Sequence, residues 1–126
     1  MRYILDTHAI LWCTDRRNNK LSPKAEEAII DQKNSIFISS ASLWEIAIKK
    51  GLGKIDVSFD RLLDELDRVG FSVLHAESKY LQKVIDLPQI HKDPFDRLII
   101  ATALVEDMTV ITSDDNIQKY DVRWVW

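Results

Sequence analysis

The feature that most restricts the fold of this chain is the alternation of short β-type runs with longer helical runs. Strands are predicted where apolar, β-branched and aromatic residues gather, at residues 2–5, 36–39, 71–75, 109–113 and 123–126. Helices are predicted at residues 7–14, 22–32, 42–51, 58–70, 77–87 and 94–108, with a short helix near 114–120. This alternation is typical of an α/β sandwich with a mainly parallel sheet of about five strands.

Length and composition indicate one cytoplasmic domain. The 126 residues contain no repeat, linker or low-complexity segment, so we expect a single domain over residues 1–126. The one cysteine, Cys13, excludes a disulfide within the chain and is expected to be a buried, unreactive thiol. The start MRYILD lacks the pattern of a signal peptide, and no apolar run is long enough for a membrane span. We therefore expect no contact with a membrane.

Acidic residues stand where predicted strands end. Asp6 follows the first strand, Asp114 follows the fourth, and Glu45 lies in the first turn of the helix after the second. Parallel strands end at one edge of the sheet, where open α/β folds bind ligands. Asp96 begins the helix that leads into the fourth strand, and a connecting helix starts near that same edge. The sequence therefore predicts that four acids from separate segments converge.

Convergence of four carboxylates implies a bound cation. Two carboxylates about 4 Å apart repel by roughly 4 kcal/mol at an effective dielectric constant of about 20. An all-oxygen ligand set selects a hard ion, Mg²⁺ or Mn²⁺, over zinc. Two such ions can activate water, hold a phosphate and stabilise a leaving oxygen, which is the chemistry of phosphodiester hydrolysis. The net charge of −3 argues against a basic nucleic-acid binder, but bound cations would reverse the local sign.

Each acid also has a purely structural interpretation. The candidates are a capping box for Ser42 and Glu45, an N-cap for Asp93, a charge that complements the helix dipole for Asp96, a turn for Asp6, and a helix cap for Asp114 or Asp115. No single acid decides between the two interpretations. Only their convergence favours the functional one.

Four stretches in order, LDTHAILW, SSASLWEIAIKKGLGKI, HKDPFDRLIIATA and VITSDDNI, resemble the PIN domain of VapC-type toxins from bacterial toxin–antitoxin pairs. The resemblance runs over essentially the whole chain. It implies a PIN-like three-layer sandwich and a metal-dependent endoribonuclease that a co-produced antitoxin holds inactive. It also implies an RNA substrate, a homodimer, and an antitoxin peptide that lies across the groove.

The resemblance also assigns residues to the site. The catalytic, metal-binding acids of the family fall on Asp6, Glu45, Asp96 and Asp114. Thr112 matches a hydroxyl position that often joins the site, and Asp93 starts close to the same helix end as Asp96. Arg97 matches a basic position beside the third acid, where it would contact a substrate phosphate; a surface or salt-bridge role is the alternative.

Two other classes of function compete with a nuclease. A receiver-type signalling domain also binds Mg²⁺ on a parallel sheet, but it needs an acid pair after the first strand, and here Asp6 stands alone. A non-catalytic module that keeps the PIN fold and binds RNA or protein is the second alternative. The complete set of acids argues against it.

Histidines and tryptophans are given structural roles. His8, His75 and His91 lack the spacing of a zinc site and are expected in packing or solvent, although His8 follows Asp6 closely enough to face the groove. Trp12 and Trp44 are expected in the core.

Overall fold

The computed structural model covers residues 1–126 and describes every side chain except that of Arg16. In chain order its elements are β1 (Arg2–Leu5), α1 (Thr7–Thr14), the 3₁₀ helix η1 (Arg16–Asn18), α2 (Pro23–Ile30), β2 (Ser35–Ser39), α3 (Ser40–Gly51), α4 (Phe59–Arg68), β3 (Ser72–Leu74), α5 (Ser78–Asp86), α6 (Pro94–Glu106), β4 (Thr109–Ile111), α7 (Asp115–Gln118) and β5 (Trp124–Val125). The strands form one five-stranded sheet in the order β3-β2-β1-β4-β5, parallel throughout. The predicted α/β class and parallel sheet are confirmed.

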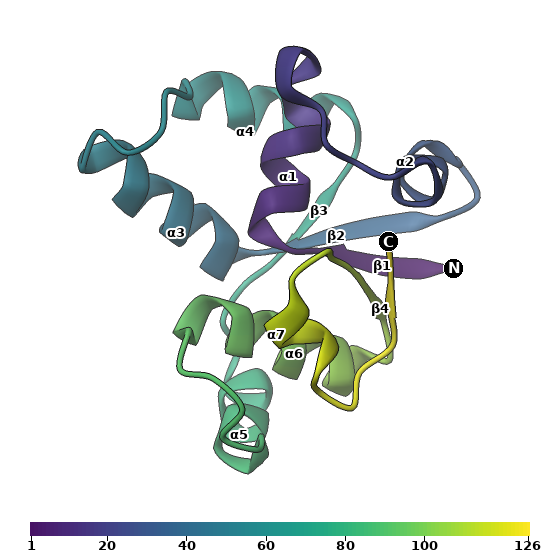
Figure 1. Ribbon diagram of the computed structural model, residues 1–126, viewed down its shortest axis with the longest axis vertical. Coiled ribbons are helices and arrows are strands. Elements are labelled where there is room, and N and C mark those ends of the chain that lie inside the picture. The colour runs from purple at the N-terminus through teal and green to yellow at the C-terminus, as the bar shows by residue number, and fades with distance from the viewer.

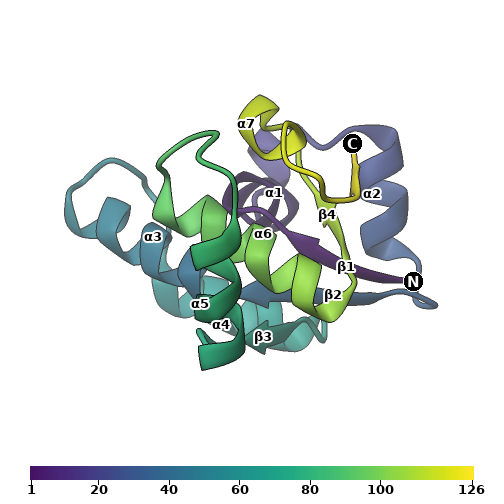
Figure 2. The ribbon, with the colours of Figure 1, turned by 90° about the horizontal axis from the view of Figure 1, so that it is seen from below.

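Helices cover both faces of this sheet. In the view of Figure 1, α1, α2 and α4 lie above the sheet, and α5, α6 and α7 lie below it. The view from below shows α5 and α6 in front of the strands, with α1 and α2 behind them (Figure 2). α3 continues from the end of β2 and contacts both α1 and α6. None of the helices in the described part of the chain has the length and apolar character needed to cross a bilayer.

The sequence of β1 shows why both faces need cover. Tyr3 and Leu5 belong to the core that includes Ile10 of α1, whereas Ile4 between them packs in the core with Ile99 of α6. Successive side chains of a strand point to opposite faces. A near-continuous apolar strand is therefore the pattern of a parallel sheet that is buried on both sides.

Side chains fix the starts of α2 and α6 where the sequence predicted them. Ser22 accepts a hydrogen bond from the N–H of Ala25, and Asp93 accepts one from the N–H of Asp96. In both helices a proline occupies the first turn, where its missing N–H costs nothing. Asp93 is therefore confirmed as an N-cap.

The capping box considered as the structural alternative for Ser42 and Glu45 does not form. α3 starts earlier than expected, with Ser39 as its N-cap, because the hydroxyl of this serine accepts the N–H of Ala41 at 3.0 Å. Ser42 is fully buried and accepts a hydrogen bond from the hydroxyl of Thr7 at 3.1 Å. That bond joins the first turns of α1 and α3.

The core role predicted for Trp44 is also wrong. Trp44 is 64% exposed and meets Phe95 edge-on, with ring centroids 5.3 Å apart. The buried face of α3 is formed by its neighbours Glu45 and Ile46, which leaves Trp44 on the outer face. Trp12 is half-buried. Cys13 is also half-buried, and burial raises the pKa of its thiol to about 12, as expected of an unreactive cysteine.

The topology brings three helix starts to one edge of the sheet. β2, β1 and β4 are neighbours at its centre, so their carboxyl ends lie side by side. α3 follows β2 directly, α1 follows β1 after one residue, and α7 follows β4 after a short turn. Asp6 and Asp114 stand at the starts of α1 and α7, whereas Glu45 lies further along α3 and Asp96 lies at the start of α6.

Candidate functional site

Asp6 is the most buried of the four acids, with 3% of its surface exposed. It is the N-cap of α1, where Oδ1 accepts the N–H of Ala9 at 2.8 Å. Oδ2 accepts the hydroxyl of Thr112 at 2.5 Å. Burial raises the pKa of Asp6, and the charge of Asp114 raises it further, while Thr112, Ala9 and His8 act in the opposite direction. The structural alternative for Asp6 was a turn residue; in the structure Asp6 caps α1 directly after the buried strand β1.

Thr112 joins Asp6 to Asp114. Its buried hydroxyl donates to Asp6 and accepts the backbone N–H of Asp114 at 3.0 Å. Asp114, rather than Asp115, caps α7, because its Oδ1 accepts the N–H groups of Asn116 and Ile117 at 2.7 and 3.4 Å. The hydroxyl at position 112 therefore lies between two of the four acids.

Asp96 lies in the first turn of α6 and faces a histidine. Its Oδ2 lies 3.1 Å from Nε2 of His91, and the side chains of His91 and Asp96 are 12% and 14% exposed. Burial raises the pKa of Asp96 to about 6; the hydrogen bond of His91 lowers it, and the charges of Asp93 and Asp114 raise it. Asp114 thus raises the pKa of both Asp6 and Asp96, so it lies within electrostatic reach of each of them.

The raised pKa of Asp96 predicts how the stability of the metal-free protein depends on pH. The value of about 6 in the folded state exceeds the ordinary 3.8, so the folded state binds this proton more tightly than the unfolded chain does. Stability should therefore fall as pH rises from about 4 to about 6. We expect Asp96→Asn to remove roughly 1–2 kcal/mol of this fall, after allowance for solvent screening. Urea unfolding at several pH values in EDTA measures it.

Asp60→Asn is the matched control for that experiment. Asp60 also lies in the first turn of a helix, α4, but its side chain is exposed. Its variant should show the same pH dependence as the unmodified protein. If the stability of Asp96→Asn depends on pH in the same way as that of Asp60→Asn, the raised pKa of Asp96 is contradicted.

Glu45 pairs with a lysine on its own helix. It lies in the second turn of α3, because the helix starts at Ser40 rather than at the predicted residue 42. Oε2 pairs with Nζ of Lys49 at 2.9 Å, whereas the buried Oε1 has no hydrogen-bond partner. A buried carboxylate oxygen without a partner is costly. A cation beside Oε1 would satisfy it.

The donors fit a hard metal ion, although the side chains are not arranged as a finished cage. Among the described residues, no three His, Cys, Asp or Glu side chains are placed to hold one ion together. The four predicted acids nevertheless offer only carboxylate oxygens, and Asp114 repels both Asp6 and Asp96. The unpartnered Oε1 of Glu45 adds a further free donor. This chemistry suits Mg²⁺ or Mn²⁺ and not zinc.

Arg97 does not have the surface or salt-bridge role that was the alternative expected from the sequence. It is buried, with 7% of its surface exposed, and is not a surface or salt-bridge residue. Its guanidinium donates to the carbonyl of Pro88 at 2.8 Å and to the hydroxyl of Tyr120 at 2.9 Å. Weaker contacts reach the carbonyls of Val84 and Leu87 at the end of α5. This burial does not support contact with a substrate phosphate.

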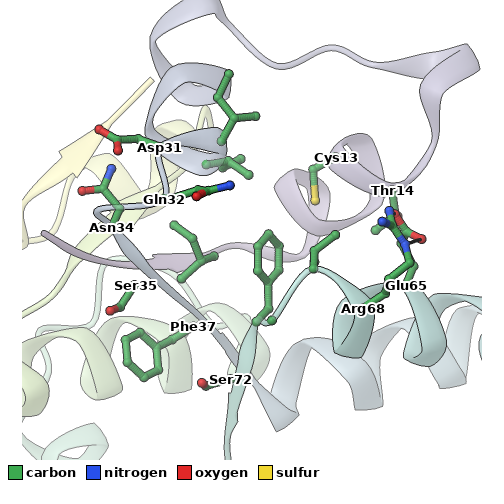
Figure 3. Close-up of a pocket in the computed structure, with 16 residues that line it drawn as sticks. Cys13, Thr14, Asp31, Gln32, Asn34, Ser35, Phe37, Glu65, Arg68 and Ser72 are labelled. Atoms are coloured by element: carbon green, nitrogen blue, oxygen red, sulfur yellow. Dashed lines mark hydrogen bonds and ion pairs between the residues drawn. The ribbon is translucent and has the colours of Figure 1, made fainter.

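A pocket of about 780 Å³ lies at the opposite edge of the sheet, near the amino ends of β2 and β3 (Figure 3). Ser35 and Ser72, which begin those strands, line it, together with Cys13 and the Glu65–Arg68 ion pair. The thiol of Cys13 is protonated at neutral pH because burial raises its pKa to about 12. This pocket has no converging acids, so the candidate site is the carboxyl edge.

A family model for the PIN domain matches residues 3–123. The chain belongs to the PIN domain family. PIN domains are generally nucleases, so the family agrees with acids at the carboxyl edge of a parallel sheet. The receiver-domain alternative is wrong on this finding. No curated protein matches the sequence significantly.

Solved structures share the architecture of this PIN domain at low sequence identity. A chain of VapBC2 from Rickettsia felis, bound to a fragment of promoter DNA, has 19% identity and a TM-score of 0.72, with 99% of this chain and 98% of that chain covered. DNA-bound VapBC from Salmonella typhimurium has 17% sequence identity and a TM-score of 0.68, with 99% of this chain and 97% of that chain covered. A toxin–antitoxin complex from Klebsiella pneumoniae has 21% sequence identity and a TM-score of 0.68, with 98% of this chain and 96% of that chain covered. Such similarity establishes the fold.

Sequence reasoning missed three side chains that contact the acids of this PIN domain, directly or through one neighbour. His91 was expected in packing or solvent, yet it bonds Asp96. Tyr120 contacts His91 from the loop after α7, and no sequence pattern relates these positions. Lys49 had a usable signal, because it stands four residues after Glu45 on a helix.

Proposed function

We propose that this PIN domain is a Mg²⁺- or Mn²⁺-dependent endoribonuclease and the toxin of a VapC-type toxin–antitoxin pair. The observation that carries the proposal is the grouping of Asp6, Asp96 and Asp114 at the carboxyl edge, beside a Glu45 whose buried Oε1 lacks a partner. A cluster of acids without neutralising partners is unfavourable unless cations bind to it. Membership of a family whose members are generally nucleases supports a catalytic role for this cluster.

Asp6, Glu45, Asp96 and Asp114 would hold the metal ions. When bound, these ions supply an activated water and charge stabilisation for the leaving oxygen of a phosphodiester. The protein contributes orientation. Thr112 fixes Oδ2 of Asp6, the N-cap hydrogen bonds hold Asp6 and Asp114 at the helix starts, and Lys49 fixes one oxygen of Glu45. Asp93 acts indirectly, by capping the helix that carries Asp96.

A second pocket, of about 760 Å³, supports a nucleic-acid substrate. It is lined by residues of α1 and α4, among them His8, which lies close enough to Asp6 to lower its pKa. Three cations line this pocket together with three acids, namely Arg17, Lys49, Arg61, Asp15, Asp56 and Glu65, and His8 stacks on Trp12 with ring centroids 5.4 Å apart. Stacked aromatic rings suit a single strand, whose bases are accessible for stacking. We therefore favour single-stranded regions of RNA.

The partners of this protein are inferred from its structural relatives. Two of the similar structures are VapBC complexes with DNA, and a third is a toxin–antitoxin complex. We infer that a cognate antitoxin binds this chain and holds it inactive, and that the chain forms a homodimer in the cytoplasm. Co-purification with the product of a neighbouring short reading frame, and loss of cleavage in that complex, would support this assignment.

Cleavage should depend on a divalent ion. We expect the purified protein to cut RNA in Mg²⁺ or Mn²⁺, to leave 5′-phosphate and 3′-hydroxyl ends, and to lose all activity in excess EDTA. Labelled RNA separated on denaturing gels measures both points. Activity should return when Mg²⁺ is restored.

Two outcomes would contradict the proposal. Undiminished cleavage in excess EDTA would remove the role of the metal. Tight RNA binding without cleavage under any metal condition would instead favour the non-catalytic binding module.

A further inference from the structure

A chain of hydrogen bonds runs from a buried cation to the acid at the start of α6. Nη1 of Arg97 lies 2.9 Å from the hydroxyl oxygen of Tyr120, and that oxygen lies 2.8 Å from Nδ1 of His91. Nε2 of His91 lies 3.1 Å from Oδ2 of Asp96. Tyr120 and Arg97 are both buried. Solvent therefore does not compete for these groups at the inner end of the chain.

The chemistry of the four groups assigns a direction to each hydrogen bond. Arg97 has only donors, so the oxygen of Tyr120 accepts from it. An ionised Asp96 has only acceptors, so Nε2 of His91 carries a proton. A neutral imidazole then has a bare Nδ1, which accepts the hydroxyl proton of Tyr120. Every proton in this arrangement has one partner.

The alternative protonation states leave groups unsatisfied. The Nδ1–H tautomer would turn a lone pair of Nε2 toward the carboxylate of Asp96. A doubly protonated ring would make Tyr120 accept two hydrogen bonds, from Arg97 and from His91, and would leave its own buried hydroxyl proton without a partner in this chain of bonds. An unpaired buried donor costs roughly 1–3 kcal/mol. The neutral Nε2–H tautomer is therefore the favoured state.

We propose that His91 is a positioning residue, held by Arg97 and Tyr120 as the Nε2–H tautomer, which fixes Oδ2 of Asp96 and so orients the carboxylate that would hold the metal. This inference rests on the proposed function, because it takes Asp96 as a metal ligand. Hydrogen bonds to the outer oxygen of a ligating carboxylate set its orientation and often change metal affinity by about 10–100-fold. The inference adds two residues, His91 and Tyr120, that the four-acid pattern does not contain.

The tautomer can be read in the metal-free protein. Long-range ¹H–¹⁵N NMR distinguishes the two ring nitrogens, and His91→Gln identifies the signals of residue 91 among the three histidines. We expect a protonated Nε2 and a bare Nδ1 in the unmodified chain. Tyr120→Phe removes the hydroxyl that donates to Nδ1 but leaves Asp96 to accept from Nε2, so Nε2 should stay protonated and only the Nδ1 signal should shift. A dominant Nδ1–H tautomer in the unmodified protein would overturn the proposal.

Mn²⁺ affinity, measured by calorimetry, tests the positioning role. His91→Leu removes the donor to Asp96 and should weaken Mn²⁺ binding by about 10–100-fold. Tyr120→Phe should weaken it by about 3–10-fold, as expected for an indirect partner. His91→Gln places an amide N–H near the position of Nε2 and should restore affinity to within about 3-fold of the unmodified protein, as an equivalent donor to the carboxylate would.

Tyr80→Phe is the control for loss of a buried tyrosine hydroxyl. Tyr80 donates to Glu106 at 2.7 Å, at the far end of α6 from Asp96. Its variant should lose some stability and keep its Mn²⁺ affinity. A purely structural role for Tyr120 would give the same result as this control, and that outcome would overturn the proposal.

The outcomes separate this inference from the proposed function. Unmodified protein that binds Mn²⁺ as tightly as His91→Leu does would overturn the positioning role alone. Unmodified protein that binds no Mn²⁺ would overturn both the metal site and the positioning role.

Discussion

Asp6→Asn should lower RNA cleavage by roughly 10²–10⁴-fold, because a metal ligand contributes several kcal/mol to the transition state and each 1.4 kcal/mol is tenfold in rate. The fold should survive. Asn is as good an N-cap as Asp, so its side-chain oxygen can still accept the N–H of Ala9. The hydroxyl of Thr112 can accept from the new amide instead of donating to a carboxylate.

The same variant should be more stable than the unmodified protein when metal is absent. Burial raises the pKa of Asp6, so the charged form destabilises the folded state at every pH above that raised value. Asn removes the charge and its repulsion with Asp114. Mg²⁺ should reverse the order, because it stabilises the unmodified protein by binding the folded state and has a weaker site in the variant. Thermal unfolding with Mg²⁺ or EDTA measures both effects.

Asp31→Asn provides the matched control. Asp31 also accepts a backbone hydrogen bond, from the N–H of Lys33 at 2.9 Å, but it is exposed and lies at the amino edge near the pocket of Figure 3. Its variant should cleave RNA at the normal rate. Asp6→Asn that cleaves as fast as Asp31→Asn would restrict Asp6 to a capping role. In cells, growth arrest upon expression should disappear with Asp6→Asn and persist with the control.

Arg97→Met should lower the free energy of unfolding by roughly 3 kcal/mol, because it removes charge-assisted hydrogen bonds and leaves buried acceptors without donors. The guanidinium satisfies the carbonyl of Pro88 and contacts those of Val84 and Leu87, where α5 ends. A cation at a helix C-terminus also interacts favourably with the helix dipole. The midpoint of thermal unfolding should fall by roughly 10 °C.

Arg123→Met separates this effect from the general loss of an arginine. Arg123 is exposed, and it bonds the carboxylate of Asp107 at 2.8 Å and the carbonyl of the same residue at 3.0 Å. Surface ion pairs contribute about 0–1 kcal/mol, so this variant should remain near the unmodified protein. Equal stability of the Arg97 and Arg123 variants would show that the carbonyls around Arg97 find other donors. Arg97→Lys should recover only part of the loss, because an ammonium cannot replace the planar guanidinium fork.

The fold was predictable because its periodicity is strong. The apolar strands and the caps at Ser22 and Asp93 are local signals that act within a few residues. The start of α3 was misplaced because several serines precede it and any of them offers a cap; the hydroxyl of Ser39 takes that role in the structure. The exposure of Trp44 depends on which face of α3 meets α1 and α6, and that is a tertiary property.

The site was predictable only as far as strand ends locate it. Asp6 and Asp114 follow neighbouring strands, so topology alone brings them together. The contact of His91 with Asp96 depends instead on a loop that Arg97 holds in place from within the core. Such an arrangement has no periodicity in the sequence. The same reason hid Tyr120, which reaches His91 from a segment 29 residues away.

Asp6 and Asp114 each use Oδ1 to begin a helix. Replacement of such an aspartate by asparagine keeps the oxygen that caps the helix but removes the negative charge. A single-nucleotide change in an aspartate codon is enough for this replacement. Under the proposed role of Asp6 and Asp114 as metal ligands, a lineage could therefore silence this protein in one step without altering its shape. The silent copy would keep the surfaces that other molecules recognise, and it would compete with an intact copy for them.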